Sequence, residues 1–218
     1  SAIWNTAGPL AQKPTRVTAQ AFSFRFPTRS FVPLLDSNFL PLAHMPLVLH
    51  SFRKHLLMSL SRDGNAEIYV MDIATQALTR LTDNPAIDTE PRWLGDGESV
   101  VFTSDRGGRP QLYRLDMSNG DSKRMTFDGR FNAKAAPSPN GRYVAMVHDS
   151  GDGRYRLAIR DLNNGITETL TESALDDSPS FAPDNRLLVY GSRQGGGRGL
   201  RIQSIDGKTQ WRLSPQQG

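Results

Sequence analysis

Cysteine is absent from the 218-residue sequence. Its absence excludes disulfide bonds, thiolate catalysis and zinc sites built on cysteine. A chain without thiols is compatible with an oxidising compartment such as the periplasm, but composition alone does not select that compartment.

Long hydrophobic runs are also lacking. The longest, at residues 31–35 and 45–49, are far shorter than the roughly 20 residues that a membrane-spanning helix requires. With 37% hydrophobic and 22% charged residues, the composition is that of a soluble globular protein. The sequence begins at Ser1 without a basic and then apolar leader, so we expect a processed form or a fragment.

Net positive charge is lacking outside the N-terminal segment. The formal net charge is +4, but residues 1–53 contain five Lys or Arg against the single acid Asp36. The remaining residues carry 21 basic and 21 acidic side chains. A surface that follows nucleic-acid phosphates needs net positive charge on the folded part, so nucleic-acid binding is not expected.

Motifs for catalysis are missing as well. His44, His50 and His55 precede or border the patterned part of the chain, which leaves only His148 inside it. A histidine-based triad or metal cluster therefore has too few members. The sequence also contains no G-x-S-x-G elbow and no G-K-S/T phosphate loop, so we expect no enzymatic activity.

What the sequence does contain is an internal repeat of about 44 residues. An aspartate ends an apolar segment in three copies, at Asp72, Asp116 and Asp161. An apolar residue followed by Thr or Ser ends each of four copies, at Leu81-Thr82, Met125-Thr126, Leu170-Thr171 and Leu213-Ser214. Such a period indicates a repeat architecture.

Each copy has the pattern of four short strands. In the second copy we expect them at residues 91–94, 99–104, 111–117 and 122–126, separated by turns rich in Gly, Asn and Asp. Four antiparallel strands in every repeat are typical of a propeller blade. A β-sandwich is the alternative, but sandwiches rarely repeat their sequence.

The predicted fold is therefore all-β: a partial propeller of about four four-stranded antiparallel blades at residues 54–218. The first blade lacks its innermost strand unless residues 40–53 supply it. Residues 1–53 contain no blade pattern and are expected to be an irregular segment or a misread reading frame. A partial ring leaves blade faces open, so we expect self-association.

The segments DTEPRWLGDGESVVFTSDRGGRPQLYRLD and DDSPSFAPDNRLLVYGSRQGG resemble the propeller of the TolB family. The resemblance covers about three quarters of the chain. It implies a periplasmic component of the Tol-Pal system, which supports envelope integrity and cell division. It further implies docking of the lipoprotein Pal, and capture of the same face by colicins during their uptake. The family's N-terminal α/β domain, which contacts TolA, and its first blades have no counterpart here.

A propeller that gates a hydrolase of the prolyl-oligopeptidase type is the alternative function. Such an enzyme needs about 250 further residues carrying Ser, Asp and His, and these are not in the sequence.

Successive strands of a blade run in opposite directions, which we call strand parity. The loops that enter each innermost strand therefore lie at the same end of the blades as the loops between the second and third strands. Function on repeat scaffolds usually resides in such loops, so we expect Pal to contact this end. The predicted contact residues are Asp88, Thr89, Glu90, Asn132, Lys134, Asp176, Asp177, Ser178, Arg106 and Arg109. We expect an acidic inner rim and a basic outer rim.

Four of these acids are also candidate ligands for a hard cation. Ca²⁺ takes six to eight oxygen ligands in flexible geometry. Asp88, Glu90, Asp176 and Asp177 are the candidates, although their spacing is not that of an EF-hand. No other cofactor is expected.

Overall fold

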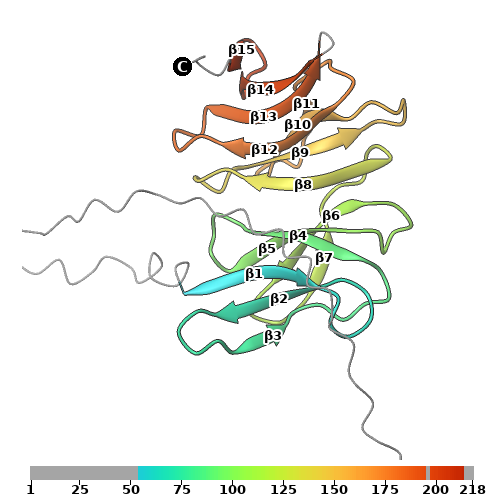
Figure 1. The fold of residues 1–218 in the computed structure, drawn as a ribbon, viewed down its shortest axis with the longest axis vertical. Coiled ribbons are helices and arrows are strands. Elements are labelled where there is room, and N and C mark those ends of the chain that lie inside the picture. The colour runs from blue at the N-terminus through green and yellow to red at the C-terminus, as the bar shows by residue number, and fades with distance from the viewer. Residues whose placement is uncertain (1–53, 195–196, 214–218) are drawn as a thin grey trace, which may run out of the picture.

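The computed structural model describes residues 54–194 and 197–213. The described residues form four antiparallel sheets that follow one another in chain order, from the bottom to the top of Figure 1. Each sheet is a simple meander, in which every strand pairs with the next one in sequence. This confirms the predicted all-β partial propeller, and we call the sheets the first to fourth blades.

The strands are short and regular. The first blade contains β1 (His55–Leu60), β2 (Glu67–Asp72) and β3 (Leu78–Arg80). The second contains β4 (Asp88–Trp93), β5 (Ser99–Ser104), β6 (Gln111–Asp116) and β7 (Ser122–Arg124). The third contains β8 (Phe131–Pro137), β9 (Tyr143–Asp149), β10 (Arg156–Asp161) and β11 (Thr167–Thr169). The fourth contains β12 (Asp176–Phe181), β13 (Leu187–Gln194), β14 (Gly197–Ser204) and β15 (Gln210–Leu213).

The first blade has three strands among the described residues, one fewer than the others. Its β1 and β2 pair in the register that β5 and β6 have in the second blade, so the strand not seen among the described residues is the innermost one. Residues 40–53, which we considered as its source, lie outside the described residues, as does the whole predicted segment 1–53. The described residues include no helix long and apolar enough to cross a membrane.

The repeated aspartates hold the turn before the last strand in the first three blades. Oδ1 of Asp116 accepts a hydrogen bond from the backbone N–H of Ser118 at 2.8 Å, and Oδ1 of Asp161 accepts one from Asn163 at 2.8 Å. Asp72 does the same for Ala74 and Thr75. Aspartate recurs here because its side chain can hydrogen-bond the backbone two residues ahead.

The repeated threonines form a hydrogen bond with a backbone N–H group that the pairing between strands does not use. Oγ1 of Thr126 accepts the N–H of Leu112 at 3.0 Å and donates to Oε1 of Gln111 at 2.7 Å. Thr82 and Thr171 accept the N–H groups of Ile68 and Leu157 in the same way. Buried N–H groups are costly when unpaired, which explains why this residue type repeats.

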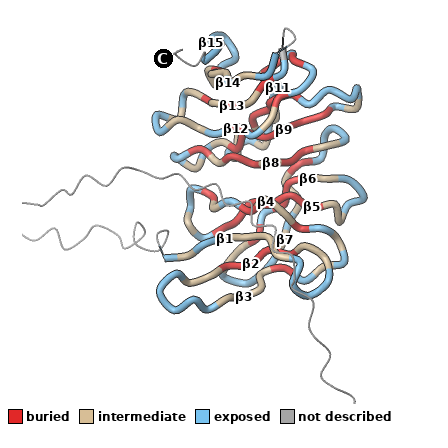
Figure 2. Tube along the Cα trace, viewed as in Figure 1, coloured by how far each residue is buried: buried red, intermediate tan, exposed pale blue. Residues whose placement is uncertain are grey.

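Apolar side chains fill the spaces between blades. In β5, Val100 and Phe102 face the first blade, whereas Val101 faces the third, and all are buried. Because both faces of the sheet are covered, the three central residues of the strand, Val100 to Phe102, are all apolar rather than alternating with polar ones. Figure 2 shows that buried residues follow the strands, while the connecting turns are largely exposed.

The innermost strands differ from the prediction. Asp88, Thr89 and Glu90, which we expected in an entering loop, belong to β4. A β-bulge between Thr89 and Arg92 shifts the register, which lets β4 begin three residues before the predicted start. The same bulge occurs in β8 and β12, so Asn132, Lys134, Asp176, Asp177 and Ser178 are also strand residues.

Candidate functional site

The candidate site lies at the end of the blades where the innermost strands begin, which we call the docking end. Asp88, at the start of β4, pairs with Ser104, at the end of β5. Asn132 and Asp176 pair with His148 and Ser192 in the equivalent positions. The ends of β5, β9 and β13 therefore lie at the same end of the blades as the starts of β4, β8 and β12, as strand parity predicts.

Three of the predicted contact residues are buried supports. Asp88, Asn132 and Asp176 are each no more than 1% exposed. Nδ2 of Asn132 donates to Oε1 of Gln111 at 2.9 Å, and Oδ2 of Asp176 accepts from Oγ1 of Thr171 at 2.5 Å. These side chains stabilise the docking end from inside and are not exposed at its surface.

Asp88 forms an ion pair with Arg106. Its Oδ2 lies 2.6 Å from Nη2 of Arg106, whose side chain is 18% exposed. Burial raises the pKa of Asp88, against the hydrogen bond from Ser104 and the positive charge of Arg106, which lower it. The guanidinium also lies over the rings of Phe102 and Tyr113, at 5.2 and 4.9 Å from their centroids. The loop after β5 is therefore tied to the start of β4.

The bulges place one residue of each innermost strand in a left-handed conformation. Glu90, Lys134 and Ser178 have φ of 57°, 55° and 51°. They are spaced 44 residues apart, as the repeat requires. Left-handed backbone is unusual for residues other than glycine, so each bulge has to be held by its surroundings.

Hydrogen bonds hold these bulges from one blade to the next. The N–H of Glu90 donates to Oγ of Ser59 in the first blade at 3.1 Å. Oε2 of Glu90 in turn accepts from the N–H of Lys134 in the third blade and from Oγ1 of Thr103, both at 3.0 Å. One carboxylate thus fixes the bulge of the next blade.

Lys134 continues this connection to the fourth blade. Its Nζ lies 2.6 Å from Oδ1 of Asp177, and the same oxygen accepts the N–H of Ser178 at 2.7 Å. The side chains of Lys134 and Asp177 are 37% and 47% exposed. The pair is thus ordered and accessible at the same time.

The predicted acidic inner rim is wrong. Two of its carboxylates, Asp88 and Asp176, are buried, and a third, Asp177, is paired with Lys134. Asp88 is paired with Arg106, and Asp176 accepts a hydrogen bond from the hydroxyl of Thr171. The accessible members of the predicted set are Thr89, Glu90, Arg109, Lys134, Asp177 and Ser178.

The four calcium candidates do not form a cluster. Asp88 binds Arg106, Glu90 binds Thr103 and Lys134, and Asp177 binds Lys134. Among residues 54–194 and 197–213, no group of three or more His, Asp or Glu side chains is arranged to hold a metal ion. A mixture of carboxylates and cations does not suit a calcium site.

Sequence reasoning missed two residues of this end. Ser59 supports the bulge of Glu90, and His148, 6% exposed, places Nδ1 2.8 Å from Oδ1 of Asn132. Burial lowers the pKa of His148, so the neutral ring is favoured. A signal for Ser59 was available in the sequence. The bulge residues recur every 44 residues, so a contact that holds one bulge is expected to recur at the same spacing.

Comparisons with known proteins agree with this architecture. A sequence profile described as the TolB beta propeller domain matches residues 52–218. The Tol-Pal system protein TolB of Bordetella pertussis is 38% identical over 150 residues, which are 68% of this chain and 34% of that protein. The crystal structure of TolB from Acinetobacter baumannii superposes with a TM-score of 0.70 at 45% identity, covering 76% of this chain and 41% of that one.

More distant structures share the fold alone. A puromycin hydrolase superposes with a TM-score of 0.60 at 15% identity, over 74% of this chain and 28% of that chain. This chain spans about a third of the Bordetella protein and about two fifths of the Acinetobacter protein. On the profile match and the identity to these relatives, the chain belongs to the TolB β-propeller family.

Proposed function

We propose that this chain is a non-catalytic protein-docking module of the Tol-Pal system, located in the periplasm, and that it binds Pal at the docking end. The observation that carries the proposal is the row of bulges at Glu90, Lys134 and Ser178, which are fixed from blade to blade and partly accessible.

The rigidity of this row supports a binding role. The backbone N–H groups of Glu90, Lys134 and Ser178 all donate to side-chain oxygens, so the strand starts are ordered before any partner arrives. A surface that is ordered in advance loses less conformational entropy on binding. The relatives with 38% and 45% identity are TolB proteins, which is why we assign the partner to the Tol-Pal system.

Accessible and buried residues have different tasks in this proposal. The direct contacts are Thr89, Glu90, Lys134, Asp177, Ser178 and Arg109. These contacts are held in position from inside the blades by Asp88, Asn132, Asp176 and Arg106. The exposed Lys134–Asp177 pair offers both charges to a partner, and exposed ion pairs contribute to orientation and on-rate more than to affinity.

Calorimetric titration with purified, non-lipidated Pal tests the proposal. We expect saturable binding by the 218-residue chain, weakened by salt because charged side chains take part. A parallel titration uses a chain extended to the length of the Acinetobacter relative. If neither chain binds Pal while both are folded, the proposed partner is wrong.

A further inference from the structure

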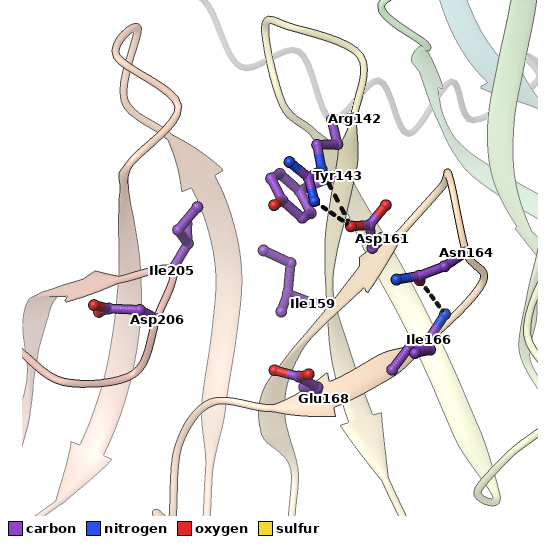
Figure 3. Close-up of a pocket in the computed structure, with 9 residues that line it drawn as sticks. All are labelled: Arg142, Tyr143, Ile159, Asp161, Asn164, Ile166, Glu168, Ile205 and Asp206. Atoms are coloured by element: carbon purple, nitrogen blue, oxygen red, sulfur yellow. Dashed lines mark hydrogen bonds and ion pairs between the residues drawn. The ribbon is translucent and has the colours of Figure 1, made fainter.

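A second site lies at the opposite end of the propeller, between the third and fourth blades. It is a surface pocket of about 350 Å³ (Figure 3). One wall comes from β9, β10 and β11 with the turn before β11, and the other from Ile205 and Asp206 in the turn after β14. The docking end is not part of it.

The internal repeat shows which side chain occupies the equivalent position in the second blade. Ile159 pairs with Ala145 and Glu168 in the third blade. In the second blade the same register position is occupied by Arg114, which pairs with Val101 and Lys123. The two blades therefore differ by a long cationic side chain at one position and by the sign of charge next to it.

Arg114 is fixed in its place. Its Nε donates to Oγ of Ser99 at 3.0 Å, and its Nη2 donates to Oδ2 of Asp96 at 2.9 Å. On the face of the second blade that packs against the third, this register position is thus occupied by an arginine that is bonded within its own blade. Ile159 is shorter and leaves the corresponding space open.

The walls of the pocket suit the stem of such a side chain. Ile159 is 6% exposed and Ile205 packs against the core between the third and fourth blades. Figure 3 shows Ile159 and Tyr143 directed toward the space between the two walls. Long cationic side chains lay their methylene groups along apolar surface of this kind.

The charges around the pocket are mainly negative. Nε and Nη2 of Arg142 both donate to Oδ2 of Asp161, at 3.1 and 2.9 Å, so that cation is already engaged. Glu168 and Asp206 line the pocket in addition, and the largely exposed Lys208 places Nζ 3.7 Å from Oδ2 of Asp206. Where the second blade has Lys123, which would repel a cation, the third blade has Glu168.

We propose that this pocket binds an arginine side chain presented by a partner polypeptide. The arginine takes the place that Arg114 has one blade earlier, with its stem between Ile159 and Ile205 and its guanidinium at Glu168 and Asp206. Arginine is preferred to lysine because its planar fork forms paired hydrogen bonds with carboxylates.

The test uses N-acetyl-arginine-N-methylamide as the probe and the corresponding citrulline compound as a neutral control of the same shape. Backbone amide shifts of the ¹⁵N-labelled 218-residue chain are followed by NMR. We expect saturable shifts at Ile159, Glu168 and Ile205 with arginine, and affinity about tenfold lower with citrulline, the loss equivalent to about 1.4 kcal/mol. Equal binding of both probes, or shifts only at other residues, would overturn the proposal.

Two variants sharpen the result. Glu168→Gln is expected to lower the affinity for the arginine probe several-fold, whereas the exposed Glu98→Gln in the second blade serves as the matched control. Ile159→Arg fills the pocket as Arg114 does and abolishes binding. If that variant fails to fold, Glu168→Gln decides alone, and unchanged affinity there contradicts the assignment. A failure of Pal to bind would be a separate result from a failure of the arginine probe to bind, because the docking end lies at the other end of the blades.

Discussion

Nη2 of Arg106 lies 2.6 Å from Oδ2 of Asp88, and this contact fastens the loop after β5 to the start of β4. The carboxylate is fully buried, whereas the guanidinium reaches solvent at one edge. The two residues were expected to be surface contacts on the inner and outer rims. They are instead partners that hold the docking end together.

Arg106→Ala is therefore expected to destabilise the chain by about 3 kcal/mol, because it leaves a buried carboxylate without its cation. Urea unfolding followed by circular dichroism measures this. Asp88→Asn combined with Arg106→Met removes both charges and should recover much of the loss. An Arg106→Ala variant as stable as the parent chain would show that Asp88 does not depend on this partner.

Thr126→Val tests the role of the repeated threonine. Valine keeps the shape of the side chain but removes the acceptor for the N–H of Leu112 and the donor to Gln111. An unpaired buried N–H group costs about 1–3 kcal/mol, so the midpoint of urea unfolding should fall accordingly. The control is Thr79→Val, at an exposed position of β3, where a change below about 0.5 kcal/mol is expected.

His148 predicts how stability varies with pH. Burial lowers its pKa in the folded chain, whereas the unfolded chain keeps a value near 6.5. Below about pH 6.5 the unfolded chain binds more protons, so its population rises and stability falls as the pH decreases toward the folded pKa. Above that window the residue has no effect.

Urea unfolding at pH 7.5 and 5.5 measures the effect, with His148→Gln as the comparison. We expect the parent chain to lose more stability between the two values than the variant does. The pKa of Asp152 is about 2, so this carboxylate does not titrate in the window. Identical pH dependence in both chains would contradict the assignment to His148.

The fourth blade carries an apolar face that predicts self-association. Leu200 has the register position of Leu112, yet it is 52% exposed whereas Leu112 is fully buried. Among the described residues no further blade packs on Leu200. Light scattering coupled to size exclusion should show concentration-dependent association, reduced by Leu200→Glu and unchanged by Ile87→Glu, which alters an exposed residue elsewhere. A compact monomer at all concentrations would refute this expectation.

Much of the fold was predictable because local chemistry repeats. Turn-forming residues such as Asp116 and Asn119 and the terminal Thr126 recur for reasons that act within a few residues or across one hairpin. Strand parity then fixes which loops share an end. Predicting these features does not require knowing how deeply any side chain is buried.

The site was less predictable because burial and bulges depend on neighbouring blades. Nothing local to Asp88 or Asp176 indicates that the next strand covers it. The bulge at Glu90 is held by Ser59, which accepts the N–H of Glu90, and the Glu90 carboxylate in turn accepts the N–H of Lys134; both partners are distant in sequence. The pocket at Ile159 becomes visible only when the register aligns it with Arg114.

The most direct test of the docking end is the affinity for Pal of two single variants, measured by calorimetry. Ser178→Lys adds a long cation at a bulge where the third blade already has Lys134, so the backbone tolerates it. Ala77→Arg adds one at an exposed turn of the opposite end. We predict at least about a tenfold loss, roughly 1.4 kcal/mol, for Ser178→Lys and no change for Ala77→Arg. Unchanged affinity with Ser178→Lys, or a loss confined to Ala77→Arg, would contradict docking at the bulges.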